Sequence, residues 1–231
     1  MVLAAAVTGG DCPAERNTKR RRLIYNDDGG ALKHLSKPEM NACLDLRLAG
    51  LVGTQVDTVF FCGHDDFAKV FYNSKLEGVE INGSEGLKEL LGRGVDPLNE
   101  IIDFCHRNEL EIFYSCRMND IHDSFDRQLG KFKRDHPEWL LGSPDAKYAP
   151  KSVKEAIWSS LDFAVPEVRE HVKQCIREVY EGRDWDGLEF DYGRNASLFR
   201  PTFEGRPVEQ RHRDMLTEFQ RQLRKMTREY S

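Results

Sequence analysis

The sequence lacks the features that mark several common classes of protein. It has no apolar run long enough to cross a membrane. Positive charges do not exceed negative ones, since the net charge is -5, and a general nucleic-acid binder normally has a basic face. None of the six cysteines forms a CxxC pair, so buried free thiols are expected rather than a zinc site or a disulfide framework. Residues 1–10 are small and apolar without a basic n-region, so they do not form an intact signal peptide.

What the sequence does contain is an alternation of strand and helix patterns. Strands are predicted at 23–25, 57–62, 111–116 and 187–192, and helices at 38–51, from 97, from 166 and at 208–229. Residues 66–93 are expected to form a loop with a short helix. Residues 1–21 show no periodicity and are expected to be flexible, while 22–231 are expected to form one domain. Alternating β and α units predict an α/β fold with a parallel sheet and right-handed crossovers.

Four such units make half of a (β/α)8 barrel, and a complete barrel typically needs about 250 residues. We therefore expect a TIM-barrel-type fold that is partial, a half-barrel with two open sheet edges. The sequence leaves two explanations open: the chain is a fragment of a longer protein, or two half-barrels form a homodimer.

Polar residues follow each predicted strand, and parallel strands place these positions on one rim. Candidate residues are therefore the ones at the four strand ends: Asp27 and Asp28; His64 and Asp65; Arg117, Asn119 and Asp120; Glu189, Asp191 and Arg194. The carboxyl ends of barrel strands are where such folds keep their chemistry.

The strand Gly187–Tyr192 alternates apolar and acidic residues. Alternation has the period of a strand, so Glu189 and Asp191 share one face. Unpaired carboxylates are costly to bury, which favours a polar cavity at the strand end. Pairing with arginines of the barrel is the structural alternative.

Three segments resemble the glycosyl hydrolase-like 10 family. They are His136-Pro137-Glu138-Trp139-Leu140, Leu161-Asp162-Phe163 through Pro166-Glu167-Val168-Arg169, and Trp185-Asp186-Gly187-Leu188-Glu189-Phe190-Asp191. The resemblance implies hydrolysis of a glycosidic bond in a carbohydrate, without a metal or other cofactor, by an exported or periplasmic bacterial enzyme. Such chemistry needs two carboxyl groups.

Under this resemblance Asp191 is the favoured catalytic carboxylate, with Glu189 as its support and Asp120, Asp27 or Asp28 as the second carboxyl. The candidate substrate-binding residues are Asp27, Asp28, His64, Arg117, Asn119, His122, Trp139, Trp158 and Arg194. Each of the two tryptophans could stack on a sugar ring or pack in the core. His64 and His122 could belong to the substrate site or be ordinary polar residues of loops.

Two other functions stay open from the sequence. Tyr25-Asn26-Asp27-Asp28-Gly29 resembles a motif of metal-dependent polysaccharide deacetylases, but no second histidine follows His64 at the HxxxH spacing of that family. The second alternative is a non-catalytic carbohydrate-binding half-barrel.

Overall fold

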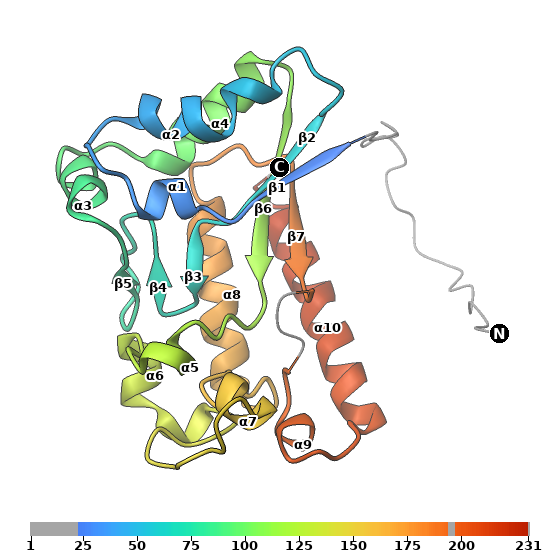
Figure 1. Cartoon of the computed structure of the whole chain (residues 1–231). Coiled ribbons are helices and arrows are strands. Elements are labelled where there is room, and N and C mark those ends of the chain that lie inside the picture. Colours follow the sequence, from blue (N-terminus) through green and yellow to red (C-terminus); the bar gives the residue numbers. More distant parts are fainter. Residues whose placement is uncertain (1–22, 194–196, 231) are drawn as a thin grey trace, which may run out of the picture.

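A computed structural model describes residues 23–193 and 197–230. The predicted flexible segment 1–21, Cys12 and Arg194 lie outside the described residues. The main sheet has four parallel strands in the order β1-β2-β6-β7 (Figure 1). Their bounds are Ile24–Asp27, Thr58–Phe61, Glu111–Arg117 and Gly187–Asp191. Sequential parallel strands joined through helices confirm the predicted α/β fold with four βα units of a partial barrel.

The longer helices follow the signals read from the sequence. They are α2 (Met40–Arg47), α3 (Glu85–Gly92), α4 (Pro97–Arg107), α8 (Pro166–Tyr180) and α10 (Gln210–Thr227). Asp96 caps α4 by accepting from the backbone N–H groups of Leu98 and Asn99, and Pro97 occupies the first turn, where its missing N–H is not needed. The helix expected at 38–51 ends at Arg47 and continues as the short 3₁₀ turn η1 (Ala49–Leu51).

The two faces of the main sheet differ in polarity. Val59, Ile112 and Cys116 are buried on the face that the helices cover. The strand register places Phe113, Ser115 and Arg117 on the opposite face, beside Gly187, Glu189 and Asp191. A side chain at Gly187 would meet the Phe113 ring, since a Cβ there would lie 2.2 Å from it. Glu189 and Asp191 therefore lie on the face away from the helices.

Residues 64–81 form a second, three-stranded sheet, which corrects the expectation of a loop. Its strands are β3 (His64–Asp66), β4 (Lys69–Val70) and β5 (Glu80–Ile81), in that order. Strands of two or three residues are too short to show a period of two in the sequence, which is why the sequence did not predict them.

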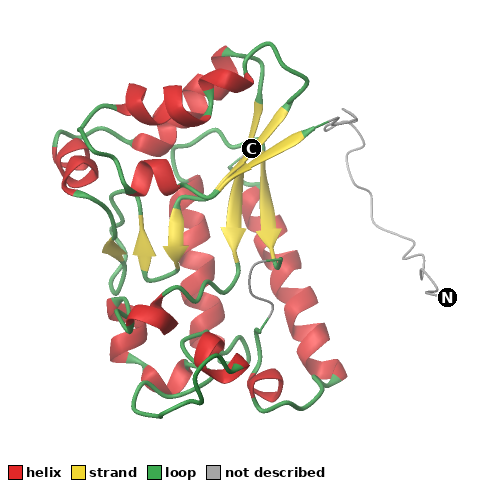
Figure 2. Ribbon diagram, in the orientation of Figure 1, coloured by secondary structure: helices red, strands yellow, loops and turns green. Residues whose placement is uncertain are grey.

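A long insertion follows β6 and lies beyond the C-terminal ends of β6 and β7 (Figures 1 and 2). Its elements are α5 (Asp123–Asp126), α6 (Lys131–Asp135), η2 (Pro137–Trp139) and α7 (Val153–Ile157), and α9 (Arg200–Phe203) lies beside them. The short helix α1 (Gly30–Lys33) directly follows β1.

Trp158 anchors this insertion, in agreement with the core alternative. It is 1% exposed, and its Nε1 donates to the Ser124 carbonyl at 3.1 Å, so neither ring face is open to a sugar. Trp139 is half-buried, and its ring stacks on His136 with centroids 3.6 Å apart.

Two expectations drawn from composition can be checked on the described residues. All five described cysteines are free and buried, as predicted: Cys43, Cys62, Cys105, Cys116 and Cys175. None of the described helices has the length and apolar character needed to cross a membrane.

Candidate active site

The end of β1 carries two adjacent aspartates with different surroundings. Asp27 is fully buried, accepts from the Gly29 N–H at 2.9 Å and pairs with Arg47 Nε at 3.0 Å. Its carboxylate therefore stabilises the turn after β1 and connects it to the C-terminal end of α2. Asp28 is about half-exposed, accepts from the Gly30 N–H at 3.1 Å and lies 3.7 Å from Arg47 Nη2, so it is the more accessible of the two.

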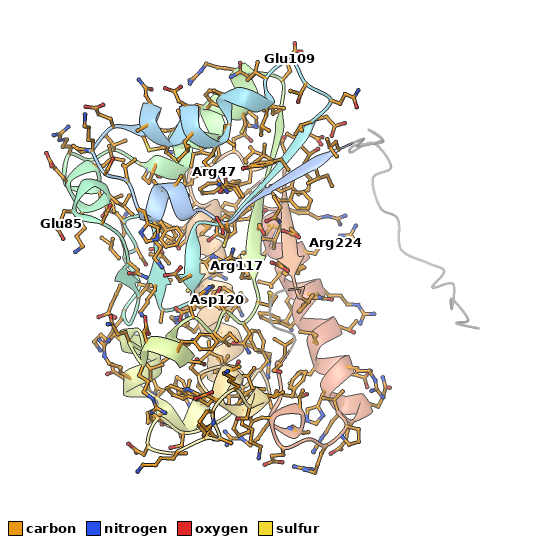
Figure 3. The ribbon with its side chains drawn as sticks, in the orientation of Figure 1. Arg47, Glu85, Glu109, Arg117, Asp120 and Arg224 are labelled. Carbon is orange, nitrogen blue, oxygen red and sulfur yellow. The ribbon has the colours of Figure 1, made fainter. Side chains whose placement is uncertain are left out.

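Arg117, the last residue of β6, links the ends of β1 and β6. Its side chain is 6% exposed, and it lies 3.8 Å from Asp28 Oδ2 and donates to Asp120 Oδ2 at 3.3 Å. Figure 3 shows Arg117 and Asp120 together near the middle of the molecule, with Glu109, which precedes β6, at the top of the view. The predicted convergence of Asp28, Arg117 and Asp120 is therefore present.

Asp120 and His122 form a tightly bound carboxylate–imidazole pair. Asp120 Oδ1 accepts from the His122 backbone N–H at 2.9 Å and from its ring Nδ1. Burial alone would raise the pKa of Asp120, but the bonds from His122 and the charge of Arg117 outweigh it and lower the pKa to about 2. The same bond to Asp120 raises the pKa of His122, against the opposing effect of burial. Asp120 is thus a carboxylate at every ordinary pH.

These residues border a pocket of about 40 Å³ between the loops that follow β2 and β6. Asp65 is one wall of it: its carboxylate binds Lys33 Nζ at 2.6 Å and the Asn82 amide. The lining is almost entirely polar and contains both signs of charge: Lys33, Asp65, Asp66, Lys69, Asn82, Asp120, His122, Asp123 and Asp126. Carboxylates, amides and ammonium groups are suitable hydrogen-bond partners for hydroxyl groups.

Beneath the pocket, one lysine is shared between two carboxylates. Lys133 is 0% exposed, and its Nζ lies 2.9 Å from Asp66 and 2.8 Å from Asp123. The two aspartates come from β3 and α5, so the ammonium joins the two loops that wall the pocket. Burial opposes the charged form of Lys133, but the two carboxylates raise its pKa above the ordinary value.

Asp66 and Asp123 share this cation unequally. Burial raises the pKa of Asp123 to about 6, and the charge of Asp66 adds to that effect, while Lys133 opposes it. For Asp66, burial is outweighed by Lys133, so its pKa is lowered. Asp123 also accepts from the Ser159 hydroxyl. Asp123 is thus the member of the cluster that binds a proton first.

The two acidic residues of β7 lie on the sheet face beside β6. Asp191 is opposite Arg117 in the strand register, and its Oδ1 accepts from the Gly193 N–H at 2.7 Å. Glu189 is opposite Ser115, and burial raises its pKa. Its Oε2 is buried without a hydrogen-bond partner among the described residues. Neither residue lines the pocket described above.

The structure gives three other predicted site residues a local role. His64 is buried, with Nδ1 2.7 Å from the Tyr114 hydroxyl. Asn119 is buried too; it binds both the N–H and the carbonyl of Leu161 and the carbonyl of Ser197. Trp158 lies in the core. These residues position the loops at the strand ends.

Sequence reasoning missed most of the pocket lining. One available signal was the Asp65-Asp66 pair directly after the second predicted strand, of which only Asp65 was assigned to the rim. Asp123 had a similar signal after His122. Lys33, Lys69, Asn82 and Lys133 had none, because the segments that carry them have no strong period. Among residues 23–193 and 197–230, no group of three or more His, Cys, Asp or Glu side chains could hold a metal ion.

Known structures resemble this chain over most of its length. The maltogenic α-amylase AmyB of Thermotoga neapolitana is 17% identical, with a TM-score of 0.43 over 78% of this chain and 41% of that one. The α-galactosidase AgaA of Geobacillus stearothermophilus is 14% identical, with a TM-score of 0.47 over 90% and 26%. The α-L-fucosidase isoenzyme 2 of Paenibacillus thiaminolyticus is 13% identical, with a TM-score of 0.42 over 90% and 30%. This chain thus spans less than half the length of each.

Sequence comparison gives a more direct assignment. No curated protein matches the chain. The family model for glycosyl hydrolase-like 10 matches residues 40–198, which is more than half of the chain and includes all three segments singled out from the sequence. The chain therefore belongs to the glycosyl hydrolase-like 10 family.

Proposed function

We propose that this protein hydrolyses a glycosidic bond in a carbohydrate, at the C-terminal ends of its parallel strands. The observation that supports this most is that a member of a glycosyl hydrolase-like family has acidic residues at these strand ends and a polar pocket beside them. Barrel enzymes keep their catalytic residues at this end of the sheet.

Asp191 is the catalytic carboxylate in this proposal. It ends β7 and lies opposite Arg117 in the strand register, on the same face of the sheet. Glu189 lies two residues earlier on the same strand, so their Cα atoms are about 6.6 Å apart. Burial raises the pKa of Glu189 and the charge of Asp191 adds to that effect, and Glu189 is the supporting carboxyl group in this proposal.

Asp120 has a supporting role, although it is one of the three carboxyls favoured by the sequence. A general acid needs a pKa near the working pH, whereas the pKa of Asp120 is about 2. Its carboxylate instead holds Arg117 and His122 in place. Asp28, half-exposed on the same rim, 3.8 Å from Arg117 and 3.7 Å from Arg47, is the second carboxylate in this proposal.

The test is to incubate the full chain with a panel of oligosaccharides in ¹⁸O-labelled water. Hydrolysis places one labelled oxygen at each new reducing end, which mass spectrometry detects as a 2 Da increase. Labelled products that form in proportion to the protein support the proposal. Binding of an oligosaccharide without labelled products would instead identify a non-catalytic carbohydrate-binding protein.

A further inference from the structure

His122 differs from the other histidines in the surroundings of its ring. The other six lie outside the pocket: His34 ends α1, His106 pairs with Asp186 before β7, His212 caps α10, His136 stacks on Trp139, and His64 and His171 are buried. His122 lines the pocket, and its side chain is 61% exposed.

The bond to Asp120 occupies one ring nitrogen of His122, Nδ1, and leaves the other for a substrate. Because Nδ1 donates to the carboxylate, the neutral imidazole has its lone pair on Nε2 and the protonated imidazole has an N–H there. Among the described residues, none bonds to Nε2. Asp120 is itself buried and held by Arg117, so the ring is oriented by groups that cannot easily move.

We propose that His122 is the proton-transfer residue of this pocket, with Asp120 and Arg117 as its positioning residues. The inference rests on the proposed function and names the group that protonates the leaving sugar. The Nε2–H bond breaks as its proton passes to the glycosidic oxygen, and the bond from that oxygen to the anomeric carbon breaks. Water adds to the anomeric carbon and loses a proton to Asp191, the catalytic carboxylate of the proposed function, which releases it to solvent, and solvent returns a proton to Nε2.

The charged groups around His122 favour its protonated form on balance. Asp120 and Asp65 raise the pKa of His122, while burial and Arg117 lower it, and the net direction is upward from 6.5. The other charged groups that line the same pocket are Lys33, Asp66, Lys69, Asp123 and Asp126. The raised pKa favours the protonated imidazole, which is the form that can donate a proton to a leaving group.

The experiment compares two substrates that differ in their need for a proton. A 4-nitrophenyl glycoside has a leaving group that departs as an anion, whereas an unmodified oligosaccharide has one that must be protonated. His122→Ala is expected to lower kcat/KM for the oligosaccharide by roughly 10²- to 10⁴-fold, with a much smaller loss for the 4-nitrophenyl glycoside. Added imidazole should restore part of the oligosaccharide activity, and His106→Gln, at the other end of the sheet, should leave both rates unchanged.

Three results would count against the inference. Equal losses on both substrates without rescue by imidazole, or an unchanged His122→Ala enzyme, would show that His122 does not transfer the proton, while the proposed function would stand. If the wild-type protein hydrolysed neither substrate, the proposed function would fail first, and the role of His122 would fail with it.

Discussion

Arg117 donates to Asp120 across 3.3 Å, and both side chains are almost completely buried. This ion pair fixes the end of β6 to the loop that bears His122. We expect Arg117→Met to destabilise the fold by about 3 kcal/mol or more, because it leaves the Asp120 carboxylate buried without its cation. Urea unfolding monitored by circular dichroism measures the change.

A matched control for this substitution is Arg93→Met. Arg93 forms an i, i+4 pair with Glu89 on the surface of α3, and both side chains are more than half exposed. Exposed pairs of this kind contribute about 0.5 kcal/mol or less. Equal losses of stability in the two variants would show that the Arg117–Asp120 pair is no more than a surface contact.

Lys133 provides a second test of the loops around the pocket. Lys133→Met removes the one cation shared by Asp66 and Asp123, and we expect a loss of about 3–5 kcal/mol at pH 7.5, as for other broken buried ion pairs. Lys131→Met, which removes an exposed pair with Asp135 on the same helix, should leave the free energy of unfolding close to the wild-type value. A loss in Lys133→Met no greater than this would contradict the burial of the shared charge.

The pH dependence of stability should reveal Asp123. Its folded pKa, about 6, is above the ordinary value of 3.8, so the folded state binds this proton more tightly than the unfolded state. Its contribution to stability is therefore fully present below pH 3.8 and is lost as the pH rises through 6. By linkage the difference is on the order of 3 kcal/mol, of which most falls between pH 4 and pH 6.

Asp123→Asn isolates this effect from the other titrating groups. We expect the wild-type free energy of unfolding to fall more steeply than that of the variant between pH 4.5 and pH 7, measured by urea denaturation in matched buffers. Parallel curves for the two proteins would mean that Asp123 titrates normally in the folded state.

The sequence predicted the elements that have a long or regular pattern. The helix from Pro166 has five apolar residues on one face, and β6 is rich in β-branched and aromatic residues, so both were located within one or two residues. Asp28, Arg117 and Asp120 were placed on one rim because parallel strands bring their carboxyl ends together.

The rest depended on contacts between residues far apart in the chain. Lys133 belongs to a five-residue helix in which Lys131, Arg134 and Asp135 are exposed, and lysine is almost never fully buried, so its position beneath the pocket had no sequence signal. Asn119 was predicted to bind the substrate, but its side-chain amide donates hydrogen bonds to the backbone carbonyls of Leu161 and Ser197. Such partners are known only once the insertion is folded over the strand ends.

If Asp191 is the catalytic carboxylate, hydrolysis depends on its side chain. The most direct test measures kcat/KM for an oligosaccharide with the wild-type protein and with Asp191→Asn. Asp145→Asn, on an exposed loop, is the control. Asn is nearly isosteric with Asp and can still accept the Gly193 bond, so folding and glycan binding should be retained. We expect kcat/KM to fall by roughly 10²-fold or more in Asp191→Asn and to stay unchanged in Asp145→Asn. Hydrolysis by Asp191→Asn at the wild-type rate would contradict this expectation.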